Sequence, residues 1–421
     1  MRAVDTVVIG AGHAGLAVSH LLGRAGRDHV VIDRGRVAEA WRTQRWDSLH
    51  LLTPRWMTRL PGWRYAGPGS EGFMPAGELV GHLERYAASS AAPLELGREV
   101  LQVASSADGY RVVTDGAAWL ARHVVIATGP TGRPRIPAAV HGLADDVHVL
   151  AAADYRNPDR LPEGGVLVVG ASASGAQIAD ELARAGRRVV LAVGSHTRVP
   201  RRYRGLDVHW WLDQTGRMAR TIDTSTDPVA ARREPSFQLA GREPRDVRGT
   251  DVDLNTLRAA GVELTGRLRV SHGHRVGFAD DLAATVRQAD DRLARFLDIV
   301  DAHVESTHLT AEVDPADRPA PVGIGRPRRR LDLRAEGIGT VLLATGYAPH
   351  HPWLKVPVAG PDGYLRQVRG TTPAPGLYVV GQRFQHRRDS ATVDGARHDA
   401  HDVVSHLCRD DCLALRALEL R

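Results

Sequence analysis

The chain has 421 residues, of which 43% are hydrophobic and 25% charged, an ordinary composition for a globular protein of two or three domains. No apolar run approaches the roughly 20 residues that span a bilayer, and no secretory leader precedes the first apolar strand, so we expect a cytoplasmic protein with no membrane partner. The net charge of +6 comes from scattered arginines without a basic tail, a pattern that argues against nucleic-acid binding.

Only two cysteines are present, Cys408 and Cys412, both near the C-terminus. They exclude a disulfide framework, and their spacing suits two turns of a terminal helix that carries inert thiols. Disulfide reductases built on paired nucleotide-binding folds need a redox dithiol near a flavin, which this pattern does not offer. The histidines form no H-E-x-x-H pattern and no G-x-S-x-G elbow occurs, so we expect neither a metal site nor a hydrolase.

The first half of the chain alternates predicted strands and helices. Strands are expected at 6–9, 30–33 and 123–127, and a second unit begins with a strand at 166 and continues with another at 189–193. Helices are expected from about residue 13, over 77–88 and over 174–185, and a tryptophan-rich irregular stretch covers 41–75. Its tryptophans, with Trp210 and Trp211, either pack between elements or line an apolar pocket.

Beyond residue 196 the pattern weakens until an amphipathic helix, expected over 280–304 and packed on the core. Strands at 340–344 and 377–380 and a last helix from near Gly395 follow. Two strands end in Ala-Thr-Gly, one at 127–129 and the other at 344–346, on either side of the second unit. This order predicts one nucleotide-binding domain made from the two ends of the chain, with a similar domain inserted between them.

The first glycine-rich turn has the full dinucleotide-binding pattern. Gly10, Gly12 and Gly15 form G-x-G-x-x-G between a strand and a helix, and Asp33 ends the next strand. The three glycines allow a tight turn, close approach to a pyrophosphate and close packing of helix on strand, while the acid binds a ribose hydroxyl. The turn therefore predicts a bound dinucleotide.

The second turn keeps Gly170 and Gly175, with Ser172 in place of the middle glycine. No acid ends the following strand, where Ser195, His196 and Arg198 stand instead. Because arginine and hydroxyl groups bind a 2′-phosphate that an acid would repel, this end favours NADPH over NADH. The alternative is a degenerate turn beside a solvated basic loop.

Two dinucleotides in one chain suggest that a nicotinamide reduces a second cofactor, for which FAD is the obvious choice. We therefore predict an α/β protein with two Rossmann-like domains of the glutathione-reductase type, the second inserted into the first. Residues 1–160 and 336–421 would form the FAD-binding domain, and residues 161–335 the NADPH-binding domain.

The sequence resembles the NADPH-dependent flavoprotein monooxygenases with two dinucleotide-binding domains, which include N-hydroxylating, flavin-containing and Baeyer–Villiger types. The resemblance covers most of 1–200 and 336–407 and is specific for fold and cofactors rather than for substrate. It is carried by VVIGAGHAGLAVSHLL, RWDSLHLLTPRWMTRLPG, HVVIATGPTGRPRIP, DYRNPDRLPEGGVLVVGASASGAQIADELA, VLLATGY and GLYVVGQRFQHRRDSATVDGARHDAHDVVSHL. It implies FAD and NADPH as cofactors, with a small molecule and O2 as substrates.

The resemblance also implies a set of cofactor-binding residues. Toward FAD these are Gly10, Gly12, Gly15, Asp33, Arg42, Trp46, Asp47, Leu49, Gly381, Ser390 and Asp394; toward NADPH they are Gly170, Ser172, Ser174, Gly175 and Arg198. Thr128, Gly129, Thr345 and Gly346, which end the two Ala-Thr-Gly strands, are expected to contact a cofactor as well. The last helix would point its positive N-terminus at the flavin, where it stabilises reduced flavin. No acid or base is assigned a catalytic role.

The family fingerprint before the second turn is incomplete. Tyr155 and Asp154 fit it, but Ala151 stands at its histidine position and Val147 at its glycine position. We expect NADPH to reduce the flavin, and O2 to form a flavin hydroperoxide that oxygenates a small organic molecule. The missing histidine motivates a non-oxygenating reductase, dehydrogenase or oxidase as the alternative, and the degenerate second turn with the basic bias motivates a non-catalytic redox sensor. A homo-oligomer is left open.

Overall fold

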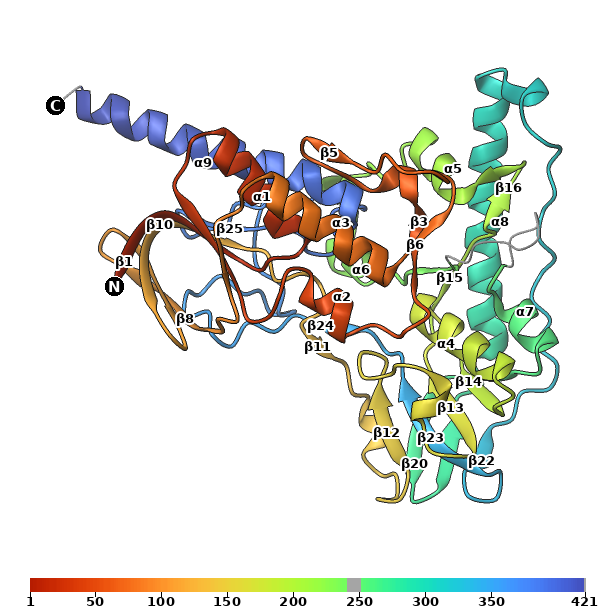
Figure 1. Cartoon of the computed structure of the whole chain (residues 1–421). Coiled ribbons are helices and arrows are strands. Elements are labelled where there is room, and N and C mark those ends of the chain that lie inside the picture. Colours follow the sequence, from red (N-terminus) through yellow and green to blue (C-terminus); the bar gives the residue numbers. More distant parts are fainter. Residues whose placement is uncertain (241–250, 420–421) are drawn as a thin grey trace.

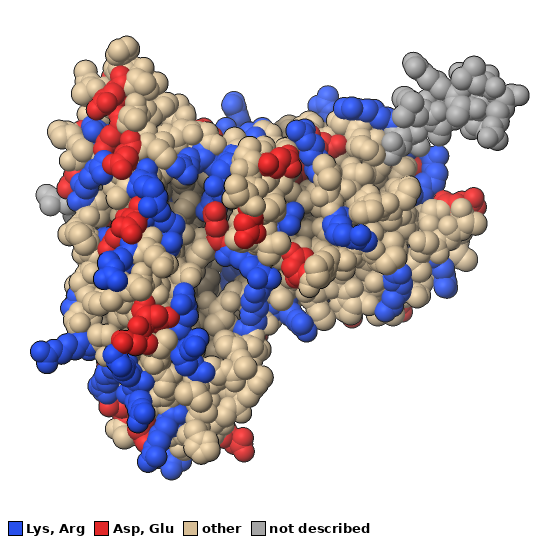
Figure 2. Space-filling view, turned by 180° about the vertical axis from the view of Figure 1, so that it is seen from behind, with Lys and Arg blue, Asp and Glu red and all other residues tan. Residues whose placement is uncertain are grey.

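The computed structural model describes residues 1–240 and 251–419, with side chains as far as Arg409. The chain forms two lobes set at an angle, each built on its own sheet (Figure 1). Across these residues no helix has an apolar stretch of the length that crossing a bilayer requires. Basic and acidic side chains are interspersed over both lobes on the face shown in Figure 2.

The first lobe is built on a seven-stranded sheet in the order β7-β2-β1-β10-β9-β8, with β25 also paired to β10. Five of its strands run parallel: β1 (Arg2–Ile9), β2 (His29–Asp33), β7 (Leu94–Leu96), β10 (Ala118–Ile126) and β25 (Leu377–Val379). β9 (Gly109–Thr114) and β8 (Val100–Ser106) extend it antiparallel. The last four residues of β1 are buried, as expected for a central strand covered on both faces.

Three helices share one core cluster with this sheet: α1 (His13–Arg24), α3 (Ala76–Ser89) and α9 (Val393–Glu419). Helix α9 crosses α1, so the first and last helices of the chain pack together (Figure 1). The prediction that both ends of the chain build one unit is thereby confirmed at the level of packing. Cys408 lies on α9, and the side chain of Cys412 is outside the described residues.

The second lobe is built on a parallel sheet in the order β12-β23-β13-β14-β19. The strands are β12 (His148–Ala151), β23 (Ile338–Leu343), β13 (Gly165–Val169), β14 (Val189–Ala192) and β19 (Glu263–Thr265). Helices α4 (Ala173–Arg184) and α7 (Leu254–Ala259) share its core.

This pairing corrects the predicted boundaries at 160/161 and 335/336. Strands β12 and β23 lie outside 161–335, yet both belong to the second sheet, where β23 pairs with β12 and β13. The predicted boundaries fail because apolar strands of similar pattern fit either sheet, and only long-range pairing assigns them. In particular the second Ala-Thr-Gly strand belongs to the second lobe.

Two paired segments carry the chain between the lobes. β11 (Arg133–Pro134) lies on the outgoing segment and β24 (Tyr347–Ala348) on the returning one, and they form an antiparallel ribbon. The 41–75 stretch, expected to be irregular, contains α2 (Glu39–Thr43), β3 (His50–Pro54), β4 (Arg59–Leu60), β5 (Trp63–Arg64) and β6 (Phe73–Pro75).

The region of weak pattern adds two groups of elements to the second lobe. It contains β15 (Thr197–Arg198), β16 (Arg202–Tyr203), β17 (Leu206–Asp207), α5 (Val208–Gln214), α6 (Pro228–Arg232), β18 (Phe237–Gln238), β20 (Leu268–His272), β21 (Arg275–Phe278), α8 (Leu282–Ser306) and β22 (Arg330–Asp332). One group is the sheet β20-β21-β22, which packs on the main sheet, and the other is a cluster around α5 and α8. The predicted amphipathic helix is confirmed as α8, whose Phe296, Leu297 and Val300 bury against Trp211 of α5. Short 3-10 turns occur at Arg55–Met57, Ala138–Val140, Pro158–Arg160, Ile222–Thr224 and Leu309–Ala311.

Candidate functional site

The first glycine-rich turn joins β1 to α1 in a shape that leaves no room for side chains on its inner side. Gly10 has a φ of +115°, and a Cβ there would lie 2.5 Å from the carbonyl oxygen of Ala127. A Cβ on Gly15 would lie 1.9 Å from the carbonyl oxygen of Gly10. Around Gly12, by contrast, no atom lies within 4 Å of the place a Cβ would take. The turn is therefore tight against the sheet and open above Gly12, as a pyrophosphate cradle must be.

Asp33, at the end of β2, is tied to this turn. Its carboxylate accepts hydrogen bonds from the backbone N–H of Ala11 at 2.7 Å and of Gly35 at 2.8 Å. These bonds fix the carboxylate beside the open side of Gly12. A carboxylate oxygen accepts more than one hydrogen bond, so acceptor capacity remains for a ribose hydroxyl.

The loop that precedes α9 closes on the first turn. Gly381 has a φ of +74°, and a Cβ there would lie 2.8 Å from the Cβ of Ala14. His13 hydrogen-bonds the carbonyl of Ala391, and burial lowers the pKa of its imidazole to about 4. Its Nε2 is buried without a hydrogen-bond partner in the described chain. An orphaned polar atom between the turn and the start of α9 fits a ligand that lies there. Sequence reasoning passed over this residue.

Two other residues predicted near the flavin, Ser390 and Asp394, make hydrogen bonds or ion pairs with neighbouring protein groups. The Ser390 hydroxyl, which is fully buried, accepts the backbone N–H of Arg387 at 2.9 Å and so caps the loop. The Asp394 carboxylate, in the first turn of α9, pairs with Arg59 through two bonds of 2.6 and 2.7 Å and with Arg397 at 3.1 Å. Both residues thus shape the start of α9.

Three of the residues predicted along the flavin from the 41–49 stretch contact the second lobe, whereas Arg42 stays within the first. Trp46 and Leu49 are buried in the core cluster of the second lobe. Asp47 accepts a hydrogen bond from the Asn157 amide at 2.6 Å. Arg42 pairs with Glu84 of α3.

A second contact across the same seam involves the fingerprint aromatic residue. The hydroxyl of Tyr155 donates to Glu181 of α4 at 2.9 Å, and the other oxygen of Glu181 accepts the Ser48 hydroxyl at 2.7 Å. The neighbouring fingerprint positions hold Ala151 and Val147, both buried. We call the contacts of Trp46, Asp47, Ser48 and Leu49 with the second lobe the lobe seam.

The second glycine-rich turn repeats the geometry of the first. Gly170 has a φ of +108°, and a Cβ there would lie 2.5 Å from the carbonyl oxygen of Ala344. A Cβ on Gly175 would lie 1.8 Å from the carbonyl oxygen of Gly170. Each turn thus rests on its own Ala-Thr-Gly strand: Ala127 under the first and Ala344 under the second.

The residues that follow these two strands lie beside the turns. Gly129 and Gly346 have φ values of +75° and +80°, and no atom lies within 4 Å of the place that a Cβ would take on either residue. Thr128 is exposed next to Gly10, whereas the Thr345 hydroxyl donates to the Arg135 carbonyl in the connecting segment. Gly129 and Gly346 therefore leave backbone open on the side of each turn.

The N-terminus of α4 carries the two serines expected to face a phosphate. Ser172 is its N-cap residue, and Ser174 lies in its first turn, half-exposed. Across from them Arg267 donates to the Ser195 hydroxyl at 2.9 Å and pairs with Asp281 at 2.8 Å, while its side chain stays 43% exposed. Arg267 follows β19, so no local sequence pattern links it to the tip of β14.

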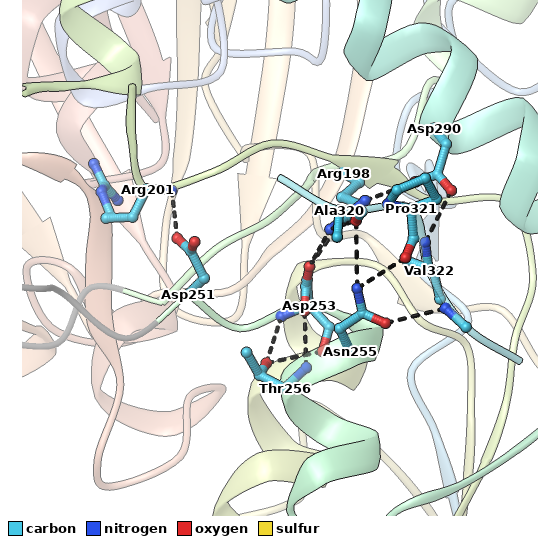
Figure 3. A network of polar contacts seen from close by, with 11 residues as sticks. Arg198, Arg201, Asp251, Asp253, Asn255, Thr256, Asp290, Ala320, Pro321 and Val322 are labelled. Atoms are coloured by element: carbon cyan, nitrogen blue, oxygen red, sulfur yellow. Dashed lines mark hydrogen bonds and ion pairs between the residues drawn. The ribbon is translucent and has the colours of Figure 1, made fainter. Parts of the chain in front are cut away.

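Arg198 lies elsewhere than predicted. Its side chain is 3% exposed and binds Asp253 at 2.8 Å, Asp290 at 2.7 Å and the Ala320 carbonyl at 2.9 Å (Figure 3). These partners bind all three nitrogens of the guanidinium and so join α7, α8 and the 320–322 segment. The geometry does not support the predicted 2′-phosphate contact, because the Arg198 side chain is buried and its charge is already paired with two carboxylates.

Comparison with known proteins connects this geometry to enzymes. Residues 7–213 match the family model described as pyridine nucleotide-disulphide oxidoreductase. Indole-3-pyruvate monooxygenase YUCCA1 of Oryza sativa subsp. japonica is 30% identical, over 98% of this chain and 95% of that protein. The uncharacterized oxidoreductase CzcO-like of Geobacillus kaustophilus is 29% identical, over 96% of this chain and 99% of its own length.

A solved structure shares the fold over the same length. The flavin-containing monooxygenase from Stenotrophomonas maltophilia superposes with a TM-score of 0.66 at 21% identity, over 97% of this chain and 99% of that one. The two-lobed α/β architecture of this chain is therefore the same fold as that of the Stenotrophomonas maltophilia protein.

Proposed function

Because the chain belongs to the flavoprotein oxidoreductases that include these flavin monooxygenases, we propose that it is a monooxygenase that uses NADPH and O2 to oxidise a small organic molecule. FAD and NADPH are the cofactors of this family. The observation that carries the proposal is the pair of matched turns, in which Gly15 and Gly175 meet the backbone at 1.9 and 1.8 Å in separate lobes.

We assign FAD to the first lobe. Bound FAD supplies the redox chemistry, since it accepts a hydride from NADPH and activates O2. The N-terminus of α1 and the open backbone at Gly12 and Gly129 would bind its pyrophosphate, and Asp33 would accept from the ribose. The orphaned Nε2 of His13 would gain a partner. The loop of Gly381 and Ser390 would bring the start of α9 to the ring.

We assign NADPH to the second lobe. Gly170, Ser172, Ser174 and Gly175 would bind its pyrophosphate at the N-terminus of α4. Ser195 and Arg267 replace Arg198 as the partners of the 2′-phosphate, since Arg267 is half-exposed and already bonded to Ser195. Gly346 gives the same open backbone here that Gly129 gives in the first lobe.

The lobe seam has a positioning role in this proposal. Trp46 and Leu49 bury apolar surface between the lobes, and Ser48 and Tyr155 share Glu181. These contacts would fix the distance between the two cofactors and keep water out of the space between them, which hydride transfer and oxygenation require.

The test compares NADPH consumption, O2 uptake and H2O2 release by the FAD-loaded protein, with and without candidate substrates. Because the relatives include indole-3-pyruvate monooxygenases, indole-3-pyruvate belongs in the panel beside amines and sulfides. We expect one substrate to lower H2O2 release while NADPH and O2 disappear in equal amounts. H2O2 equal to NADPH for every compound would instead identify an oxidase and overturn the proposal.

A further inference from the structure

Arginines gather beside the loop that precedes α9. Arg217 and Arg220 follow α5, and Arg383 and Arg388 lie in the loop itself. The two segments are paired through their backbones, since the N–H of Arg388 donates to the carbonyl of Arg220 at 2.9 Å. We call these four residues the arginine cluster.

Glu234 is the one carboxylate that the described residues pair with the cluster. Its side chain binds Arg388 and, at 3.1 Å, Arg220, and its backbone carbonyl accepts from Arg383. Within residues 1–240 and 251–419, Arg217 has no hydrogen-bond or ion-pair partner, and the Nε of Arg220 is buried without one. Among the residues that the structure describes, one carboxylate faces these four guanidiniums, so the positive charge exceeds the negative charge paired with it there, which is costly where the groups are buried.

Aromatic rings hold the guanidiniums in place. Arg388 lies 5.5 Å from the ring centre of Phe237, and Arg220 lies 5.2 Å from that of Phe384. Burial, with the nearby charges of Arg220 and Arg217, lowers the pKa of Arg388 to about 10. The group stays charged at neutral pH, so an anion is the ligand whose charge complements the cluster.

The cluster lies between the two assigned cofactor sites. Phe237 belongs to β18, whose next residue, Gln238, donates its amide to the carbonyl of Ala171 in the second turn at 2.5 Å. On the other side Arg388 lies in the loop that leads into α9 at Val393. A molecule bound at the cluster therefore lies beside both the second turn and the start of α9.

We propose that the arginine cluster binds the anionic group of the substrate, an aromatic or apolar carboxylate, and that this carboxylate takes the place of Glu234. The side chain of Glu234 is 38% exposed, so a ligand can reach it from solvent. Guanidiniums bind carboxylates through charge-assisted, often paired hydrogen bonds, and the adjoining rings suit an apolar body. The inference rests on the proposed function for the reaction, while anion binding is measurable on its own.

Calorimetric titration of the FAD-loaded protein tests it. The probes are benzoate, phenylacetate and 3-phenylpropanoate, each compared with its uncharged amide. We expect at least one carboxylate to bind roughly tenfold or more tightly than its amide, and R388Q and R220Q each to weaken it about tenfold or more. E234Q removes the competing charge and tightens binding several-fold. R295Q, an exposed arginine of α8, is the control and leaves binding unchanged.

Three results would overturn the inference: equal binding of every acid and its amide, unchanged affinity in R388Q and R220Q, or displacement of the acid by NADP⁺ in equal proportion. Displacement by NADP⁺ would indicate that the cluster binds the phosphates of the cofactor instead of the substrate. Flavin reduction by NADPH is followed on the same samples. If NADPH still reduces the flavin but the acids do not bind, the inference about the arginine cluster is wrong and the proposed function is unaffected. If the acids bind but NADPH does not reduce the flavin, the proposed function is wrong and anion binding at the cluster is unaffected.

Discussion

Arg198 and Arg267 both lie near the C-terminal end of β14, but they differ in burial. The side chain of Arg198 is 3% exposed, whereas that of Arg267 is 43% exposed. The partners of Arg198 lie 55, 92 and 122 residues further along the chain, at Asp253, Asp290 and Ala320. No local pattern could reveal that these residues would enclose it. The proposal keeps an arginine and a hydroxyl as the partners of the 2′-phosphate. The arginine is now Arg267, which follows β19 and is far from Ser195 in the sequence.

This contrast gives a paired prediction. R267Q should reduce the preference for NADPH over NADH about tenfold, because one charge-assisted contact is lost, and should leave stability nearly unchanged. R198Q should instead lower the free energy of unfolding by about 3–5 kcal/mol, because Asp253 and Asp290 lose their buried partner. Steady-state kinetics with both nucleotides and urea unfolding check the pair, and an exchange of the two outcomes would contradict the assignment.

Asp399 on α9 gives a pH-dependent prediction. It is 1% exposed, and burial, assisted by the charges of Asp389 and Asp402, raises its pKa to about 7, although the Ser390 hydroxyl and Arg387 act in the opposite direction. The folded state therefore keeps this proton between about pH 4 and 7 while the unfolded state loses it, so stability falls as pH rises through that window.

D399N removes this dependence. The variant should equal the parent in stability near pH 4 and exceed it by a few kcal/mol at pH 8. Urea unfolding across pH measures the difference, with D115N as an exposed control that shows no such trend. A stability difference that does not change with pH would refute the account of Asp399.

At the scale of elements, the two glycine turns were predictable because strand, turn and helix lie within about 30 residues of each other. The membership of β12 and β23 was not, since pairing with β13 depends on segments far apart in the sequence. The same limit applies to the lobe seam, where Trp46 and Leu49 join the core of the second lobe. Local patterns identified the cofactor-binding units, and long-range pairing decided which strands complete them.

The matched turns predict separable losses. In G15A and G175A the new methyl group would meet backbone oxygen at 1.9 and 1.8 Å, so each helix must move away from its strand. G15A should purify without FAD, whereas G175A should keep FAD and lose rapid reduction by NADPH. Flavin absorbance and reduction rates measure both. Loss of FAD in G175A, or full flavin content in G15A, would reverse the assignment of lobes.

In the whole molecule, the proposed reaction requires the two lobes to work as one unit. The β11–β24 ribbon pairs both connecting segments, and Tyr155, Glu181 and Ser48 join the lobes at the seam. Because the substrate site proposed at the arginine cluster uses residues from both lobes, it exists only when they are held together. The sequence suggested two cofactor units; their mutual placement came from contacts that no motif records.

The most direct measurement is an anaerobic titration of the purified protein with NADPH, followed by its visible spectrum. We expect a yellow protein that contains about one FAD per chain and loses its flavin absorbance as NADPH is added, with NADH far less effective. A colourless protein that FAD cannot restore, or a bound flavin that NADPH leaves oxidised, would contradict the central claim that the first lobe binds FAD and the second delivers its electrons.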